Sequence, residues 1–314
     1  MSILFTLLEI VVPVFLLIGA GYFSVWTKFL TSGIMDALIK FQVSIAVPVL
    51  LFNSMYHTDL ATSLNIFAMI GFFGSGTIAF FAAILLSRLV WKRRPGEAVA
   101  VGFCAFFPNA VMLGIPIADR AFGNAAMAAV FGIIAFHSMY NWFMGFVTME
   151  AVRRDSDSVL SGFSKAFATT FKNPLMIGLM LGMAANLISL PIPQVGQDAL
   201  DMMSAAALPV ALFALGGVLT RYNVKAEIGE ALMVSVFSLL VHPGVAWVIT
   251  AMIFDLDMIY VQATVLIAAM PTGINSYIFA TVYNRAVGTA ASTVIIATIL
   301  SLGTITGWLW FLGV

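Results

Sequence analysis

The chain has 314 residues, of which 62% are hydrophobic and only 9% are charged, and its 14 Lys and Arg balance its 14 Asp and Glu. A water-soluble chain of this length could not bury so much apolar side chain, so the composition predicts an all-α polytopic membrane protein in contact with the lipid bilayer. The zero net charge gives no indication of a nucleic-acid partner. The single cysteine, Cys104, does not support disulfides or a thiolate metal site.

Ten apolar segments follow one another along the chain. The first 26 residues lack a basic start and an evident cleavage site, so we expect a retained helix there and not a signal peptide. Since a span needs about 20 apolar residues, the sequence predicts ten transmembrane helices, at about 4–26, 34–56, 64–91, 98–119, 124–150, 172–190, 197–220, 228–254, 258–283 and 287–312.

The charges between the spans predict the domain organisation and the orientation. The longest connection, 151–171, is charged and divides a first set of five spans, 1–150, from a second set, 172–314. With both termini on the non-cytoplasmic side, all basic residues except Arg120 fall on the cytoplasmic side, as the positive-inside rule requires. The cytoplasmic residues are then Lys28, Lys40, Arg88, Lys92, Arg93, Arg94, Arg153, Arg154, Lys165, Lys172, Arg221, Lys225 and Arg285.

A repeated motif relates the two sets of spans. The pattern A-x-P-V-x-L-F begins at Ala46 in span two and again at Ala207 in span seven, 161 positions later. Each set holds an odd number of spans, so the second set enters the membrane from the opposite side, and we expect two inverted five-helix repeats, which are typical of alternating-access carriers. The alternative is a chance match favoured by a composition rich in Leu, Val and Pro.

Spans four and nine are interrupted at corresponding places. Proline inside a membrane helix removes a backbone donor and clashes with the preceding turn, which is tolerated only beside a cavity or other protein. Paired interruptions of this kind are the best sequence indicator of a transporter's binding site. The interrupting residues are Pro108, Asn109, Gly114 and Pro116 in span four and Pro271, Thr272, Gly273 and Asn275 in span nine.

Six stretches of the chain are similar to those of a known family, namely IVVPVFLLIGAGYF, AVPVLLF, PNAVMLGIPIADRAFG, NPLMIGLMLGMAANLISLPIP, ALPVALFALGGVL and AAMPTGINSYIFATVYN. Together they resemble the auxin efflux carrier family, in its short bacterial branch that includes malonate carriers. The resemblance covers nearly the whole chain and implies the fold of the bile acid sodium symporters, with spans one, two, six and seven as a scaffold and the other six as a mobile transport domain. It further implies a bacterial inner-membrane location and a site where spans four and nine cross.

That site maps onto Pro108, Asn109, Ala110, Pro271, Thr272, Gly273 and Asn275. The centres of the spans contain no Lys or Arg, so an anion there would be bound by half-helix amino termini and by the side chains of Asn109, Thr272 and Asn275. The alternative is that the two asparagines only cap the broken helices. A malonate-like dicarboxylate would use both half-helix ends, whereas a monocarboxylate with an aromatic tail would use one end and a cavity lined by Phe106, Phe107 and Tyr277.

Other polar groups within or next to the spans are candidates for coupling or gating. His137, close to Asn141 in span five, either carries a coupling proton or donates one hydrogen bond inside the bundle. His242 either has a coupling role or bonds the carbonyl freed by the proline that follows it. Glu9 either lies in an aqueous vestibule or reaches the interface. Asp119 and Arg120 form a gate, a local ion pair or a solvated loop pair.

The function expected is a carrier of a small organic anion, coupled to H+ or Na+ or to neither, with no other cofactor and no enzymatic activity. A sodium-coupled symporter, a channel or a sensor on the same fold are the alternatives. An intramembrane hydrolase using Ser75 with His137 or His242 is a weaker one, because no acid is placed to orient a histidine. Gly178 and Gly182 predict close helix packing or, alternatively, a homodimer seam.

Overall fold

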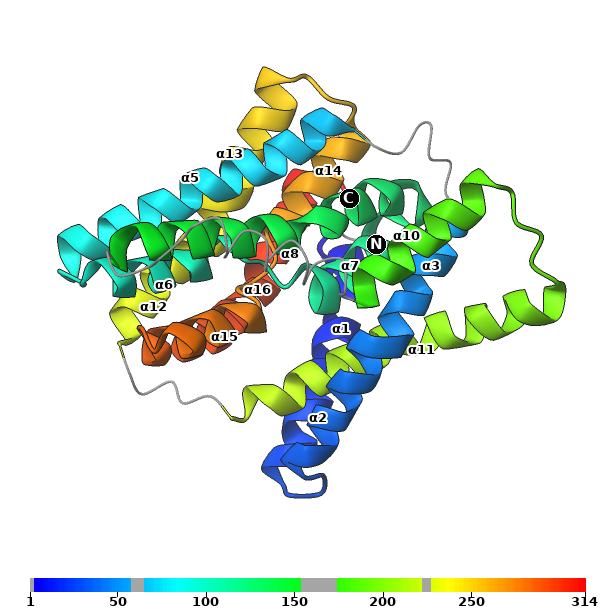
Figure 1. Ribbon diagram of the computed structural model, residues 1–314, viewed down its shortest axis with the longest axis horizontal. Helices are drawn as coiled ribbons and strands as arrows, with labels where there is room; N and C mark the ends of the chain where they lie inside the picture. Colours follow the sequence, from blue (N-terminus) through cyan, green and yellow to red (C-terminus); the bar gives the residue numbers. More distant parts are fainter. Residues whose placement is uncertain (1–2, 58–64, 154–173, 222–226) are drawn as a thin grey trace.

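The computed structural model describes residues 3–57, 65–153, 174–221 and 227–314, which are helical apart from short connections (Figure 1). The predicted connection 151–171 lies, from residue 154 on, outside this described part of the chain. The helices of the first part are α1 (Ile3–Trp26), α2 (Ser32–Phe41), η1 (Gln42–Ala46), α3 (Val47–His57), α5 (Ile66–Val90), α6 (Pro95–Phe106), η2 (Ala110–Gly114), α7 (Ile115–Phe122) and α8 (Asn124–Arg153).

The second part continues in the same manner. Its helices are α10 (Pro174–Leu187), α11 (Gln194–Leu219), α12 (Ile228–Val236), η3 (Phe237–Val241), α13 (His242–Trp247), η4 (Val248–Ile253), α14 (Met258–Ala268), α15 (Ile274–Tyr283) and α16 (Val287–Phe311). Within the described residues, seven helical segments are long and apolar enough to cross a membrane, and three shorter helices are also apolar. The prediction of an all-helical polytopic membrane protein is confirmed at this level.

Three π-helical turns precede prolines. The turns η1, η2 and η3 each end two residues before a proline, namely Pro48, Pro116 and Pro243. A proline cannot donate to the carbonyl four residues earlier, and its ring clashes with that carbonyl. In all three segments this carbonyl lies within the π turn, so the wider turn makes room for the proline and the helix continues beyond it.

Helices α1, α3, α10 and α11 pack in two close pairs, α1 with α11 and α3 with α10. In the first pair a Cβ at Gly21 would collide with the backbone of Phe213, and in the second a Cβ at Gly182 would collide with the backbone of Phe52. Both the glycines and the phenylalanines are 161 positions apart, so one contact is the counterpart of the other. Glycine therefore sets the distance between the helices in both pairs.

The same contacts decide the role expected of Gly178 and Gly182. The two glycines face the backbone of Pro48 and Phe52 on α3, within the same chain. Close packing is therefore confirmed, and the alternative of a homodimer seam on this glycine face is wrong, because α3 already covers it.

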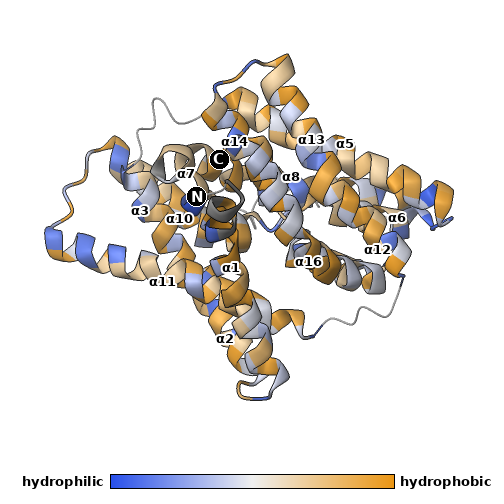
Figure 2. Ribbon diagram, turned by 180° about the vertical axis from the view of Figure 1, so that it is seen from behind, coloured by the Kyte–Doolittle hydropathy of each residue, from blue (hydrophilic) through white to orange (hydrophobic). Residues whose placement is uncertain are grey.

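The remaining helices, α5 to α8 and α12 to α16, pack against one another beside the first group (Figure 1). A buried ion pair joins several of them: Arg93, after α5, donates to Glu230 of α12 at 2.8 and 3.0 Å, while Ser87 and Thr289 donate to the same carboxylate. Many large apolar side chains are exposed, and Figure 2 shows hydrophobic residues along most of the helices; an apolar surface of this kind is what a lipid environment requires.

Candidate functional site

Both predicted breaks are present, and they lie against each other. Pro108, between α6 and η2, forms an isolated antiparallel bridge with Thr272, between α14 and α15. Two backbone hydrogen bonds of 2.8 Å flank this bridge, from the Asn109 amide to the Pro271 carbonyl and from the Gly273 amide to the Phe107 carbonyl. The crossing that was expected from the family resemblance is therefore a direct, hydrogen-bonded contact between the two interruptions.

The Thr272 side chain donates a hydrogen bond to one backbone carbonyl at the crossing. Pro108 has no amide hydrogen to donate to the carbonyl of Cys104, four residues earlier on α6. The hydroxyl of Thr272 donates to this carbonyl instead, at 2.7 Å, and Thr272 is only 1% exposed. A residue of one broken segment thus satisfies a carbonyl of the other, which strengthens the contact between them.

Two neighbouring helices satisfy further carbonyls at the ends of the broken helices. Asn141 of α8 donates its side-chain amide to the carbonyl of Phe106 at 3.2 Å. Ser238 of η3 donates its hydroxyl to the carbonyl of Met270 at 3.4 Å. The sequence indicated Asn141 but not Ser238, because a serine in an apolar span does not reveal its partner.

The amides available to a ligand differ from those expected. The amides of Asn109 and Gly273 are already used in the crossing. The first bonds within the new helices are donated by Leu113 to the Asn109 carbonyl and by Ser276 to the Gly273 carbonyl. A helix start leaves its first-turn amides without intrahelical partners, so these groups are the amides of residues 110–112 and 274–275.

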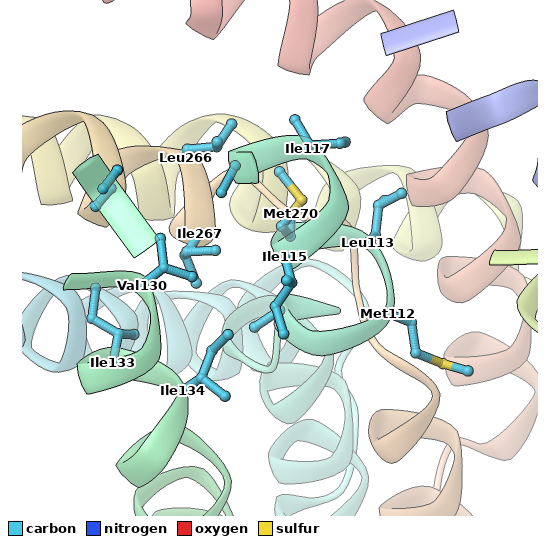
Figure 3. Close-up of a cluster of buried hydrophobic side chains, with 14 of the residues drawn as sticks. Met112, Leu113, Ile115, Ile117, Val130, Ile133, Ile134, Leu266, Ile267 and Met270 are labelled. Carbon is cyan, nitrogen blue, oxygen red and sulfur yellow. The ribbon is translucent and has the colours of Figure 1, made fainter. Parts of the chain in front are cut away.

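The segment that leads away from the first break is firmly packed. Figure 3 shows side chains of α7, which directly follows η2, lying close to those of α8 and α14. A displacement of α7 would therefore carry the crossing and α8 with it. The labelled side chains are Met112, Leu113, Ile115, Ile117, Val130, Ile133, Ile134, Leu266, Ile267 and Met270.

Comparison with known proteins decides the family. A profile described as "Membrane transport protein" matches residues 6–309. The chain belongs to this membrane transport protein family. It is 26% identical to a "Putative malonate transporter" of Rhizobium meliloti over 96% of this chain and 95% of that protein. It is also 26% identical to an uncharacterised transporter of Methanothermobacter thermautotrophicus, over 96% of each chain, and 24% identical to another of Methanocaldococcus jannaschii, over 97% and 98%.

In this membrane transport protein, the two asparagines at the crossing do not act as caps. Asn109 stands at the amino cap of η2, but its side chain accepts no capping hydrogen bond. The amino cap of α15 is Gly273, and Asn275 lies two residues inside the helix. The alternative that the two residues only cap the half-helices is therefore wrong, while their contact with a substrate stays a prediction. Both side chains lie at the crossing, where Asn109 is 8% exposed and Asn275 is half-buried.

Two of the three rings predicted to line an aromatic cavity, those of Phe106 and Phe107, fill the core of the described part of the chain instead. Phe106 and Phe107 are each 1% exposed and pack in the core around Phe103, whose ring stacks on that of Phe279 at 3.9 Å between centroids. Tyr277 packs against the other core cluster. These rings fill the space behind the crossing because large apolar side chains on both broken segments pack against each other.

His137 makes local contacts next to the crossing. Its Nδ1 is 2.8 Å from the carbonyl of Ile134, one turn earlier, and its Nε2 is 3.3 Å from the hydroxyl of Ser138. The ring meets Phe107 edge-on, with the centroids 5.7 Å apart. These contacts are those of a histidine hydrogen-bonded inside the helix bundle, one of the two roles expected from the sequence.

His242 does not bond the carbonyl that was expected. The proline after it frees the carbonyl of Leu239, but this carbonyl accepts a 2.9 Å bond from the indole of Trp308. His242 instead places Nε2 3.4 Å from the carbonyl of Phe72, which also accepts from the hydroxyl of Ser75. Ser75 and His242 therefore share one acceptor, and among the described residues no hydrogen bond joins them as a nucleophile and base would be joined.

A cavity of about 800 Å³ lies between the two groups of helices. It does not include the crossing residues. It reaches α7 at Ile115 and Pro116, directly after η2, and its walls come from α1, α3 and α11 on one side and from α7 and α8 on the other. Its polar lining consists of Asn53, Ser54, His57, Asp119, Arg120 and Ser204.

Asp119 and Arg120 lie in the last turn of α7 and not in a solvated loop, so that part of the expectation is wrong. Both residues line the cavity. The guanidinium of Arg120 donates from Nη2 to the carbonyl of Glu9 at 2.7 Å and from Nε to the carbonyl of Ile10 at 2.9 Å. The backbone of Glu9 thus contacts Arg120, but Glu9 itself does not line the cavity, whose lining on α1 begins at Pro13.

Proposed function

We propose that this membrane transport protein is a secondary carrier of a small organic anion, which it binds at the crossing of its two broken segments and moves by alternating access. One observation carries the proposal: the amino ends of two half-helices meet at a buried crossing. Half-helix amino ends attract carboxylates through unpaired amides and the helix dipole. A malonate-like dicarboxylate suits two such ends, and a relative named for malonate transport favours this class of substrate.

The proposed fold is ten transmembrane helices in two inverted five-helix repeats, 1–150 and 172–314, joined by 151–171. The paired glycine contacts support it, because Gly21 meets Phe213 in the same way as Gly182 meets Phe52. Such an exchange of partners is what a two-fold axis between the repeats produces.

The proposed mechanism is an elevator, in which spans three to five and eight to ten move against a scaffold of spans one, two, six and seven. The cavity between the two groups of helices supports a division at this place. The proposed orientation, both termini outside the cytoplasm of a bacterial inner membrane, rests on the positions of the basic residues.

Counterflow tests the proposal. Purified protein is reconstituted into liposomes loaded with unlabelled malonate, and uptake of labelled malonate is measured against empty liposomes, with and without Na+ and a proton gradient. Saturable accumulation is the expected result. Linear, unsaturable flux would favour a channel, and the absence of any flux with malonate and a series of monocarboxylates, in folded protein, would contradict a carrier.

Two substitutions locate the site. We expect Asn109→Ala and Asn275→Ala to abolish counterflow without lowering the yield of folded protein, because each removes an amide group at the crossing. Thr281→Ala is the matched control: its hydroxyl bonds the Tyr277 carbonyl on the exposed side of α15. Normal counterflow in both asparagine variants would remove the crossing from the proposal.

A further inference from the structure

The contact of Arg120 with α1 depends on a second proline. Pro13 lies inside α1 and cannot donate to the carbonyl of Glu9, four residues earlier. This carbonyl is one of the two that accept from the Arg120 guanidinium, at 2.7 Å, and the carbonyl of Ile10 is the other, at 2.9 Å. A cationic side chain of α7 thus takes the place of a missing backbone donor of α1.

This contact holds the two sides of the cavity together. The cavity is lined by Pro13, Val14 and Leu17 of α1 and by Ile115, Pro116, Asp119 and Arg120 of α7. Since α7 continues from η2 and the crossing, any shift of the crossing along α1 must break both bonds of Arg120. The contact therefore resists the relative movement that alternating access requires.

An entering carboxylate competes directly for this guanidinium. Arginine bonds an ionised carboxylate through two parallel, charge-assisted hydrogen bonds, which are roughly twice as strong as bonds between neutral groups. The present acceptors are two neutral backbone carbonyls. One of them, that of Ile10, lies in a regular stretch of α1, where a helical carbonyl accepts a bond from its own helix. Among the described residues that line the cavity, Arg120 is the one fixed cation, and Asp119 and His57 are the other titratable groups.

We infer that Arg120 is an anion-operated latch: it holds α7 against α1, and a carboxylate that enters the cavity releases it by taking over the guanidinium. The inference rests on the proposed function, since it makes the anionic substrate the trigger for its own movement. It assigns to the cavity a first carboxylate site, separate from the crossing, and limits opening to anions that can form the bidentate pair.

The test measures the distance between α1 and α7. Nitroxides are attached to cysteines in a Leu16→Cys, Ala121→Cys protein in nanodiscs, where both faces are accessible; the native Cys104 is buried, and protein without the added cysteines gives the background. Distance distributions are recorded with malonate, acetate, chloride at matched ionic strength, and malonamide, which has the shape of malonate without its charge. We expect malonate and acetate to lengthen the distance, and chloride and malonamide to leave it unchanged.

One variant changes each side of the latch, Arg120→Gln on α7 and Pro13→Ala on α1. In Arg120→Gln the long distance should be present without any anion, whereas Lys40→Gln, which removes an exposed charge on α2, should behave like the parent. Pro13→Ala supplies an amide for the Glu9 carbonyl without changing Arg120, so half-opening should require about tenfold less malonate, within the usual range of coupling between sites. An unchanged midpoint in Pro13→Ala and a short distance in Arg120→Gln would each overturn the latch.

The outcome is independent of the transport assay. A distance that responds to neither malonate nor acetate, in protein that shows malonate counterflow, overturns the latch and leaves the proposed function intact. A distance that responds in protein without counterflow supports the latch and counts against the proposed transport.

Discussion

Replacing Gly21 by alanine should weaken the packing of α1 against α11. A Cβ at this position would lie 3.1 Å from the Phe213 Cα and closer still to its carbonyl. Carbon atoms in contact prefer about 3.5–4.0 Å, so α1 must withdraw along a buried interface. Overpacking of this kind costs about 1–3 kcal/mol, and the obstacle is backbone, which has no alternative rotamer.

Gly19→Ala is the matched control. Gly19 lies on the same helix, and a Cβ there meets no atom within 4 Å. Both substitutions gain about 1 kcal/mol in helix propensity, so this gain cancels in the comparison. Gly21→Ala should therefore unfold about 2–10 °C below Gly19→Ala.

The assay is thermal unfolding of the purified protein in detergent, followed by tryptophan fluorescence. Gly182→Ala should be destabilised as much as Gly21→Ala, because its Cβ would meet the Phe52 backbone in the same way. Equal unfolding temperatures for Gly19→Ala and Gly21→Ala would refute the argument that glycine sets the helix spacing here.

Two further predictions concern the crossing and the ion pair between Arg93 and Glu227, the residue just before α12. Thr272→Val leaves the Cys104 carbonyl without its donor and should lower the free energy of unfolding by about 1–3 kcal/mol, whereas Thr272→Ser, which keeps the hydroxyl, should lose less; equal losses would contradict the role given to the hydroxyl. The hydrogen bond from Arg93 lowers the pKa of Glu227 in the folded protein. The pair therefore contributes its full stabilisation of the fold above a glutamate's usual pKa of about 4.3, and this contribution is lost as pH falls through the lowered pKa. Unfolding temperatures from pH 3 to 7 should show this loss, and Glu227→Gln should reduce it; an unchanged profile in the variant would contradict the assignment.

The positions of the broken helices could be predicted from the sequence, because proline imposes a local constraint that any fold must accommodate. The breaks around Pro108 and Pro271 lie where they were expected. What replaces a missing donor is not a local matter. The sequence could not show that Trp308 would bond the carbonyl freed before Pro243, because the two residues are brought together only by packing.

The same limit applies to the candidate site. Asn109 is at the crossing as predicted, but the bonds that use its backbone amide depend on the partner segment, 162 positions away at Pro271. The role of Phe106 and Phe107 was wrongly predicted because a ring on a broken helix can line a cavity or fill the core, and composition does not distinguish these outcomes. The sequence suggested a role for Arg120 together with Asp119, but it could not show that the acceptors of Arg120 are backbone groups, because these carry no sequence pattern.

The two backbone hydrogen bonds at the crossing have a consequence for the energetics of the proposed cycle. They join the interruptions into a single hub, so the groups around a bound anion keep their mutual distances when the hub is displaced. A site that travels without changing its own geometry has the same intrinsic affinity on either side of the membrane. Such a carrier is reversible by construction, and concentration gradients and membrane potential alone then set the direction of net flux.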